Sequence, residues 1–170
     1  MSLHSDLLTQ AKHLASREPR RPRQASLRRA ISAAYYSLFH LLISESVKCL
    51  LGGSAKRENL RACLARAFSH GAMKDAATGF ANRKVSPKIS PALAGVALQP
   101  ELVSVANAFV DLQQARHEAD YDLRRRFTRT ETQDLVERAD KATKDWHTIR
   151  RTMQAEAFLV ALLAQKQMQS

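Results

Sequence analysis

Residues 27–40 read LRRAISAAYYSLFH, which sets a strip of polar and aromatic groups into an otherwise apolar segment. At helical spacing, one face carries a cation, a hydroxyl, a phenol and an imidazole, from Arg29, Ser32, Tyr36 and His40. Another face is apolar throughout, with Leu27, Ile31, Ala34, Leu38 and Leu41. The segment therefore predicts a helix that buries one face in a core and offers the other to a partner group or a ligand.

The amino-acid composition favours helix over sheet. The 170 residues include only five glycines and five prolines, while Ala, Leu, Gln, Arg and Lys are abundant. These straight side chains lose little rotamer freedom in a helix. A chain of this length buries enough apolar surface to fold without disulfides or metal. We therefore expect an all-α fold, an antiparallel up-and-down bundle of four to five helices that forms a single domain over residues 1–170.

Apolar spacing and helix-breaking residues divide the chain into five expected helices. They cover residues 3–17, 24–51, 56–81, 100–123 and 131–166. Two prolines interrupt the first connection, and two glycines after Leu51 end the second helix. Residues 82–99 contain two more prolines, so we expect a loop with at most one helical turn. Pro100 suits the first turn of the next helix, where its missing amide is not needed.

The last expected helix is unusually long. At about 1.5 Å per residue it would measure about 54 Å, against about 42 Å for the helix over 24–51, so it must overhang the bundle or break. Its start fits a capping box that begins at Thr128 or at Thr130. Its end, within residues 155–170, carries apolar neighbours at helical spacing, Phe158, Leu159, Leu162 and Leu163. Either this end forms a homodimer contact, because it would be exposed in a monomer, or it folds back and joins the core.

The formal net charge of +11 is unevenly spread along the chain. Residues 1–51 carry eight basic and three acidic groups, residues 52–100 carry eight and two, and residues 101–170 carry eleven of each. Excess positive charge attracts phosphates by long-range steering and counterion release. The first hundred residues are therefore expected to attract a polyanion.

Several other classes of protein and site find no support in the sequence. Cys49 and Cys63 are isolated thiols without CxxC spacing or clustered histidines, so we expect no metal site and place both cysteines in or near the core. The longest apolar run, over residues 157–164, is too short for a membrane span, and the N-terminal residues lack the apolar core of a signal peptide. The expectation is a cytoplasmic protein with no membrane partner and no cofactor.

A second polar segment, residues 116–122, reads RHEADYD and belongs to the helix expected over 100–123. Together with the AYYSLFH of residues 34–40, it resembles the HEPN family, the higher eukaryote and prokaryote nucleotide-binding domains. That resemblance implies an antiparallel helical bundle that dimerises, a functional groove near the dimer interface, and a connection to RNA or nucleotides. Many members of the family are toxin ribonucleases that use an Arg-x4–6-His motif.

This catalytic motif is missing from the chain. Arg66 and His70 have three residues between them, the strip pair Arg29 and His40 has ten, and no other histidine has the required spacing. No catalytic residue is therefore assigned, and ribonuclease activity is not expected. The expected function is RNA or nucleotide binding, in a toxin–antitoxin or nucleotidyltransferase-associated system, with a small nucleotidyltransferase as a partner.

The candidate binding residues come from both polar segments, and they are Arg29, Tyr36, His40, Arg116, Asp120 and Tyr121. An arginine can hold phosphate, and a tyrosine can stack on a base. In a purely structural interpretation, Arg116 and Asp120 form a helical ion pair at i, i+4, while Asp120 or Asp122 neutralises Arg29 across the bundle. The alternative function is then a helical protein–protein interaction module with a structural polar core.

Two arginine clusters complete the candidate site. The first lies in the connection after the first helix and contains Arg20, Arg21 and Arg23; the second follows the ADYD segment and contains Arg124, Arg125 and Arg126. Each is either a solvated charge run or a phosphate clamp. A bundle of the expected topology would bring the two clusters to the same end, where together they would form one basic patch.

Overall fold

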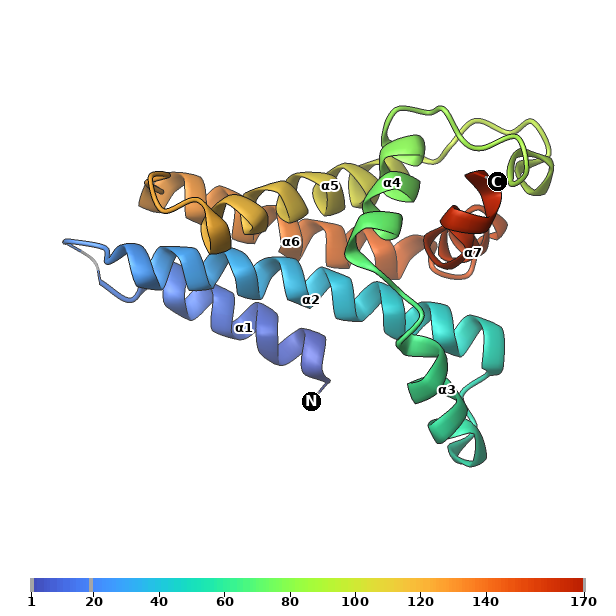
Figure 1. Ribbon diagram of the computed structural model, residues 1–170, viewed down its shortest axis with the longest axis horizontal. Coiled ribbons are helices and arrows are strands. Elements are labelled where there is room, and N and C mark those ends of the chain that lie inside the picture. Colours follow the sequence, from blue (N-terminus) through green and yellow to red (C-terminus); the bar gives the residue numbers. More distant parts are fainter. Residues whose placement is uncertain (1, 19, 170) are drawn as a thin grey trace. The chain divides into compact units, whose positions relative to one another are not determined.

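The computed structural model describes residues 2–18 and 20–169, with the side chain of Gln169 left aside, and all regular structure in this part of the chain is helical (Figure 1). The α-helices are α1 (Leu3–Ser16), α2 (Gln24–Leu51), α3 (Glu58–Ala65), α4 (His70–Ala81), α5 (Pro100–Tyr121), α6 (Arg129–Ile149) and α7 (Met153–Gln169). Two short 3-10 helices, η1 (Ala55–Arg57) and η2 (Ser90–Leu93), lie in the connections. The all-α expectation is confirmed, with seven α-helices described in place of the expected four to five.

The chain divides into two compact units, where we had expected a single domain. Unit 1 contains the residues up to His40 together with Ala108–Lys144, and unit 2 contains Leu41–Asn107 and the residues from Asp145 onward. Helices α2, α5 and α6 each contribute residues to both units. The residues of the candidate site all belong to unit 1.

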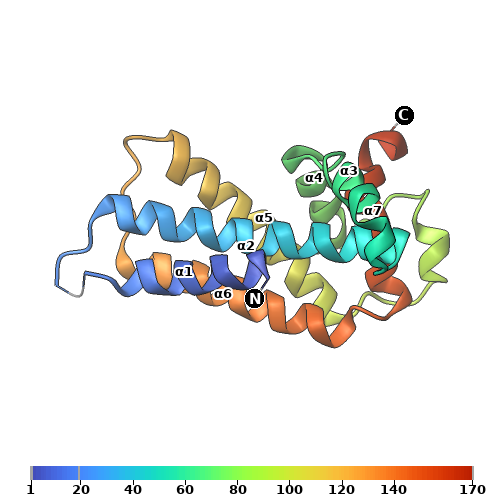
Figure 2. The same ribbon diagram turned by 90° about the horizontal axis from the view of Figure 1, so that it is seen from below.

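Unit 1 consists of α1, the first part of α2, the last part of α5 and the first part of α6. Successive segments run in opposite directions (Figures 1 and 2). Leu27, Ile31 and Phe127 are buried together, and Tyr35 of α2 packs against Phe109 of α5 with ring centroids 5.6 Å apart. The expected apolar face of the 24–51 helix is confirmed, since all five of its residues are at most 1% exposed.

Unit 2 has its own aromatic core. Trp146 and Phe158 are fully buried, and Phe158 meets Phe80 of α4 with ring centroids 4.9 Å apart. The indole Nε1 of Trp146 donates to Glu45 Oε2 at 3.2 Å, which provides the polar partner that a buried tryptophan needs. Trp146 therefore lies in the core of unit 2 with its one polar atom satisfied.

The helix expected over 56–81 is two helices. Helix α3 ends at Ala65, and α4 begins after Ser69, whose hydroxyl accepts a hydrogen bond from Ala72 N at 3.3 Å and so caps the new helix. Leu60 of α3 is 57% exposed, although the apolar spacing of this segment would place it in the core. The cysteines were also misplaced: Cys49 and Cys63 are both exposed.

The helix expected over 131–166 also breaks, which was one of the two alternatives. Helix α6 ends at Ile149, and Thr152 Oγ1 accepts from Ala155 N at 3.2 Å at the start of α7. Phe158, Leu159 and Leu162 are at most 2% exposed, so the C-terminal segment joins the core of unit 2. The second alternative for residues 155–170 therefore holds, and these buried residues provide no exposed surface for the homodimer contact that was the first.

The helix bounds and caps decide the remaining expectations about local structure. Helix α2 has the expected bounds, α5 begins at Pro100, and residues 82–99 are a connection with the single short helix η2. Of the two capping boxes, the first is formed: Thr128 Oγ1 accepts from Glu131 N at 3.2 Å. Among the described helices, none has both the length and the apolar character required to cross a membrane.

Candidate functional site

The two polar segments meet within unit 1, as the sequence predicted. Ser32 Oγ of α2 donates to Asp120 Oδ1 of α5 at 2.6 Å, and an Arg116 guanidinium nitrogen donates to the Tyr36 hydroxyl at 2.9 Å. Arg116 Nε also lies 2.7 Å from Asp120 Oδ2, so the expected i, i+4 ion pair is present. The hydrogen bonds join α2 to α5 through side chains that come from both motifs.

Arg116 is held among aromatic rings. Its guanidinium carbon lies 5.4 Å from the ring centroids of both Tyr36 and Tyr121 and 6.0 Å from that of Tyr35. Although burial acts to lower its pKa, the neighbouring Tyr36 and Asp120 raise the pKa of Arg116 above its usual value. Only 16% of this side chain is exposed, so Arg116 supports the site more than it offers a cation to a ligand.

His40 lies one helical turn beyond Tyr36. The two rings stack with centroids 6.0 Å apart and planes 27° apart, and the imidazole is half-buried. Burial lowers the pKa of His40 below its usual value, because it disfavours the charged ring. The residue is therefore an aromatic neighbour of the phenol and is disfavoured as a cation at neutral pH.

Tyr121 is an exposed member of the candidate set, with 63% of the residue accessible to solvent. Its ring packs against that of the adjacent-turn His117 with centroids 5.1 Å apart. Because its ring is open to solvent, Tyr121 is available for stacking. Tyr35, in contrast, is fully buried, and burial raises the pKa of its hydroxyl.

In the purely structural interpretation, the neutralisation of Arg29 by Asp120 or Asp122 is wrong. Asp120 binds Arg116 and Ser32, and Asp122 Oδ1 accepts from the backbone nitrogen of Arg124 at 2.9 Å. Arg29 is exposed and forms no hydrogen bond or ion pair with the described residues. Its cation is therefore uncommitted.

Arg28, which no sequence motif marked as a site residue, is the arginine of α2 that binds the end of α5. Its guanidinium donates to the carbonyl oxygens of Ala119 at 2.7 Å, Asp122 at 2.9 Å and Arg125. These carbonyls lie at and just beyond the end of α5, where helical carbonyls lack partners within the helix. Arg28 and the neighbouring Arg29 point in directions about 100° apart around the helix. The motif alone does not show which partner each of them will bind.

An open groove of about 930 Å³ lies beside the strip and is built from α1, α2 and α5 of unit 1. Its polar lining includes Arg17, Arg28, Arg29, Ser32, Tyr36 and Asp120. Its apolar lining includes Leu7, Leu14, Ala25, Ala33 and Ala119. The contribution of α1 was not predicted, because that helix carries no polar motif that would mark it.

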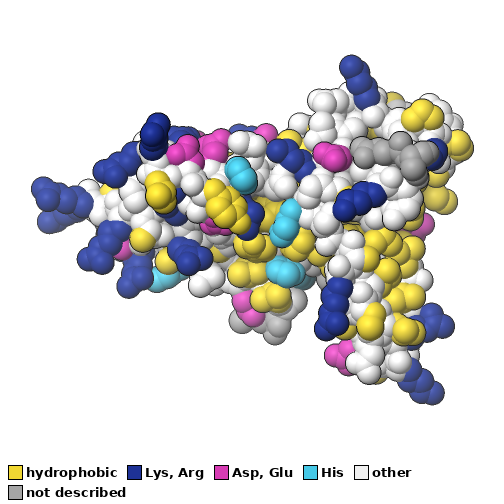
Figure 3. Space-filling model, in the orientation of Figure 1, with side chains coloured by type: hydrophobic (Ala, Val, Ile, Leu, Met, Phe, Trp, Pro, Cys, Tyr) yellow, Lys and Arg dark blue, Asp and Glu magenta, His cyan; other side chains and the backbone are white. Residues whose placement is uncertain are grey.

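The two arginine clusters lie at one end of unit 1, where their connections are joined. The side-chain amide of Gln24 donates to Phe127 O at 2.8 Å and accepts from Phe127 N at 3.0 Å, and Arg129 donates to Glu18 O. Figure 3 shows Lys and Arg side chains gathered over these connections, at the left of the view. The expected convergence of the clusters is therefore observed.

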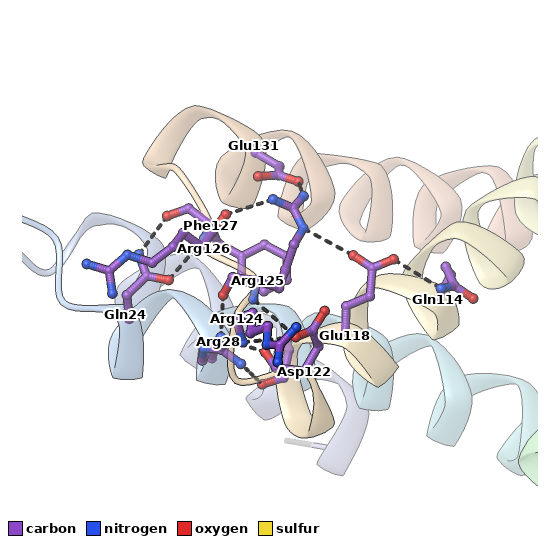
Figure 4. A network of polar contacts seen from close by, with 11 residues as sticks. Gln24, Arg28, Gln114, Glu118, Asp122, Arg124, Arg125, Arg126, Phe127 and Glu131 are labelled. Atoms are coloured by element: carbon purple, nitrogen blue, oxygen red, sulfur yellow. Dashed lines mark hydrogen bonds and ion pairs between the residues drawn. The ribbon is translucent and has the colours of Figure 1, made fainter.

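One member of the second cluster is paired within the protein. Arg125 lies between Glu118 and Glu131 and binds both carboxylates (Figure 4). The other cluster members are exposed, and we call them the basic end: Arg20, Arg21, Arg23, Arg124 and Arg126. Arg23 has only a distant carboxylate neighbour, Glu18, at 4.0 Å. The basic end therefore presents five guanidinium groups to solvent.

No protein family, curated protein or solved structure matches the chain. The described residues also contain no group of three or more His, Cys, Asp or Glu side chains that could hold a metal ion. Function must therefore be inferred from the chemistry of the strip, the groove and the basic end.

Proposed function

We propose that the chain is a HEPN-like protein that binds RNA or a nucleotide, without the Arg-x4–6-His ribonuclease motif, through the basic end and the groove beside it. The observation that carries this proposal is the convergence of two arginine clusters on one end of unit 1. Five exposed guanidinium groups in one place suit a phosphate backbone, because each can release a condensed counterion. The same proposal includes a homodimer and a role in a toxin–antitoxin or nucleotidyltransferase-associated system, with a small nucleotidyltransferase as partner.

The local balance of charge supports a polyanion as the ligand. Residues 17–29 and 118–131 meet at this end of unit 1 and contain ten arginines against five carboxylates. All five carboxylates have partners within the protein: Glu118 and Glu131 bind Arg125, and Asp120 binds Arg116. Glu18 accepts a hydrogen bond from the Ser26 hydroxyl, and Asp122 accepts one from the backbone nitrogen of Arg124. A net positive field remains at the exposed arginines, and it steers phosphates in a salt-dependent way.

The proposal is binding without cleavage. His40 is disfavoured as a cation by its burial, and it stacks on Tyr36 with no arginine at the motif spacing. His117 is exposed but adjacent to Arg116, whose guanidinium is engaged by Tyr36 and Asp120. Intact total RNA after incubation with purified protein is the expected result. Cleavage that is lost in His117→Ala would contradict this part of the proposal.

The proposal is tested with a short single-stranded RNA labelled with a fluorophore, by anisotropy at low salt. The triple variant Arg20→Ala/Arg21→Ala/Arg23→Ala should bind at least about tenfold more weakly than the unaltered protein, because three phosphate contacts are removed. The matched control is Arg66→Ala/Arg150→Ala/Arg151→Ala, which removes the same charge from exposed positions of unit 2. The proposal is wrong if the unaltered protein shows no salt-dependent affinity, or if the control triple loses as much.

A second candidate function is a helical protein–protein interaction module. The observation in its favour is that Ser32, Tyr36, Arg116 and Asp120 bind one another, as a structural polar core would. In that case Tyr36→Phe and His40→Ala lower the melting temperature and change no binding measurement. Unchanged thermal stability in both variants would count against the module.

A further inference from the structure

The groove of unit 1 holds two arginines that form no hydrogen bond or ion pair with the described residues, although the charge of Arg17 helps to lower the pKa of the neighbouring Glu18. Arg17 follows α1 and Arg29 belongs to α2, and both line the groove. Within residues 2–18 and 20–169, neither forms a hydrogen bond or an ion pair, whereas Arg28 and Asp120 in the same lining are engaged by α5. The groove therefore offers two guanidinium groups without a hydrogen bond or ion pair, one from the end of α1 and one from α2.

One wall of the groove suits the flat, weakly polar body of a ligand. Leu7, Leu14 and Ala33 supply apolar surface, and the amide of Gln10 is the other exposed polar group that α1 contributes to the lining. A volume of about 930 Å³ falls within the range of about 300–1,000 Å³ that is usual for small-molecule sites. A ligand with an anionic end and an aromatic body would match both kinds of lining.

We propose that this groove binds the phosphate monoester end of a nucleotide, with the phosphate between Arg17 and Arg29 and the base on the apolar wall. This inference rests on the proposed function and adds to it a second kind of phosphate contact, separate from the basic end. A phosphate monoester carries about −1.5 to −2 charges at pH 7, more than the single charge of a backbone diester. Two guanidinium groups match that charge, and each can bind phosphate oxygens through paired N–H donors.

The monoester could belong to a free mononucleotide or to the terminus of an RNA chain. The chemistry in the groove is the same for both, because the recognised groups are a terminal phosphate and the base next to it. A backbone phosphate in the middle of a strand lacks the second negative charge. The groove is therefore expected to prefer a phosphorylated terminus of the RNA. The arginines of the basic end are expected to bind backbone phosphates anywhere along the strand.

The first test measures binding of nucleoside 5′- and 3′-monophosphates by calorimetry, with adenosine and inorganic phosphate for comparison. At least one monophosphate should bind at least about tenfold more tightly than either comparison compound, since it alone uses both linings. Arg17→Ala and Arg29→Ala should each remove most of that difference, and the corresponding lysine variants should keep part of it. The matched control is Arg138→Ala, an exposed arginine of α6 that pairs with Asp111 and lies outside the groove. Equal affinity for monophosphates and adenosine, or alanine variants that bind as the unaltered protein does, would overturn the inference.

The second test uses one RNA sequence with a 5′-phosphate, a 3′-phosphate or no terminal phosphate. A preference for one phosphorylated end that disappears in Arg17→Ala/Arg29→Ala assigns the groove to an RNA terminus, and monophosphate binding without such a preference assigns it to a free nucleotide. RNA binding with neither a preference for an end nor affinity for monophosphates overturns this inference and leaves the proposed RNA binding intact. Binding of monophosphates by a protein that has no affinity for RNA would support this inference and contradict the proposed binding of RNA.

Discussion

Ser37 has a buried hydroxyl group, and we predict that its removal stabilises the protein. The residue is 1% exposed, and its Oγ has no hydrogen-bond partner among the described residues. A buried hydroxyl without a partner costs about 1–3 kcal/mol relative to its hydrated state. Ser37→Ala should therefore raise the free energy of unfolding by about 1 kcal/mol, measured by urea denaturation.

Ser46 provides the control for this substitution. It is also fully buried, but its Oγ donates to Leu42 O at 2.8 Å. Ser46→Ala removes a satisfied hydroxyl and should gain less than Ser37→Ala does. Equal gains in the two variants, or a loss in Ser37→Ala, would show that the Ser37 hydroxyl has a partner in solution.

The half-buried His40 is expected to make the free energy of unfolding depend on pH. Its pKa is lowered by burial in the folded protein, so the unfolded chain takes up a proton first as the pH falls. The stability that the neutral ring contributes is therefore complete well above its ordinary pKa of 6.5 and is lost as the pH falls from there toward the lowered value. Urea denaturation at about pH 8 and about pH 5.5 should show this loss, and His40→Gln should show a smaller one. His13→Gln, an exposed change on α1, should leave the loss as it is in the unaltered protein.

At the scale of residues, the sequence predicted the face on which a side chain lies better than it predicted the group that this side chain binds. Helical periodicity gives the face on which each side chain lies, and it predicted the i, i+4 ion pair between Arg116 and Asp120. The uncommitted state of Arg29 could not be predicted, because it depends on which neighbouring carboxylates are already bound. The exposure of Cys49 shows the same limit, since a typical preference for burial does not determine one position.

At the scale of elements, Arg28 is predicted to hold the end of α5 against α2. Three backbone carbonyls accept from its guanidinium, and hydrogen bonds to a charged group contribute about 1.5–3 kcal/mol when buried. Because the site is half-buried, Arg28→Ala should lower the free energy of unfolding by about 2 kcal/mol. Arg28→Lys should recover only part of this, since an ammonium cannot match the fork geometry.

The neighbouring Arg29→Ala is the matched control for this prediction. Arg29 is exposed on the same helix and forms no contact of this kind with the described residues, so the change should stay within about 0.5 kcal/mol. Circular dichroism during urea denaturation gives both values under the same conditions. Similar losses in the two variants would mean that the general charge of α2 matters and the three carbonyl contacts do not.

Helix boundaries could be predicted where glycine or proline marks them. Helix α2 ends before Gly52, which has a φ of 72°, and α5 begins at Pro100. The breaks before α4 and α7 lack both residues and depend on single caps, at Ser69 and Thr152. Serine and threonine are common within helical patterns, so neither residue alone marks the start of a new helix. Whether it caps a new helix or lies inside a continuous one depends on the apolar surface that the new helix can bury.

At the scale of the whole molecule, net charge does not identify the binding surface. Unit 1 has fifteen basic and ten acidic side chains, and unit 2 has twelve and six, so the two units have net charges of +5 and +6. What distinguishes unit 1 is the local gathering of exposed arginines from two connections that are far apart in sequence. Charge counts along the sequence could not show this, because the second cluster lies in a stretch with no net charge.

The dependence of RNA affinity on salt therefore separates the basic end from the overall charge. If Arg20 and Arg124 each bind one phosphate of a single strand, each alanine substitution should reduce the slope of log K against log salt by about 0.7, and the double substitution by about 1.4. Anisotropy titrations between about 50 and 200 mM salt give these slopes. Arg150→Ala removes the same charge from an exposed position of unit 2 and should leave the slope unchanged. An equal reduction in Arg150→Ala would mean that the RNA responds to the total charge of the protein, and the basic end would then lose its place as the binding surface.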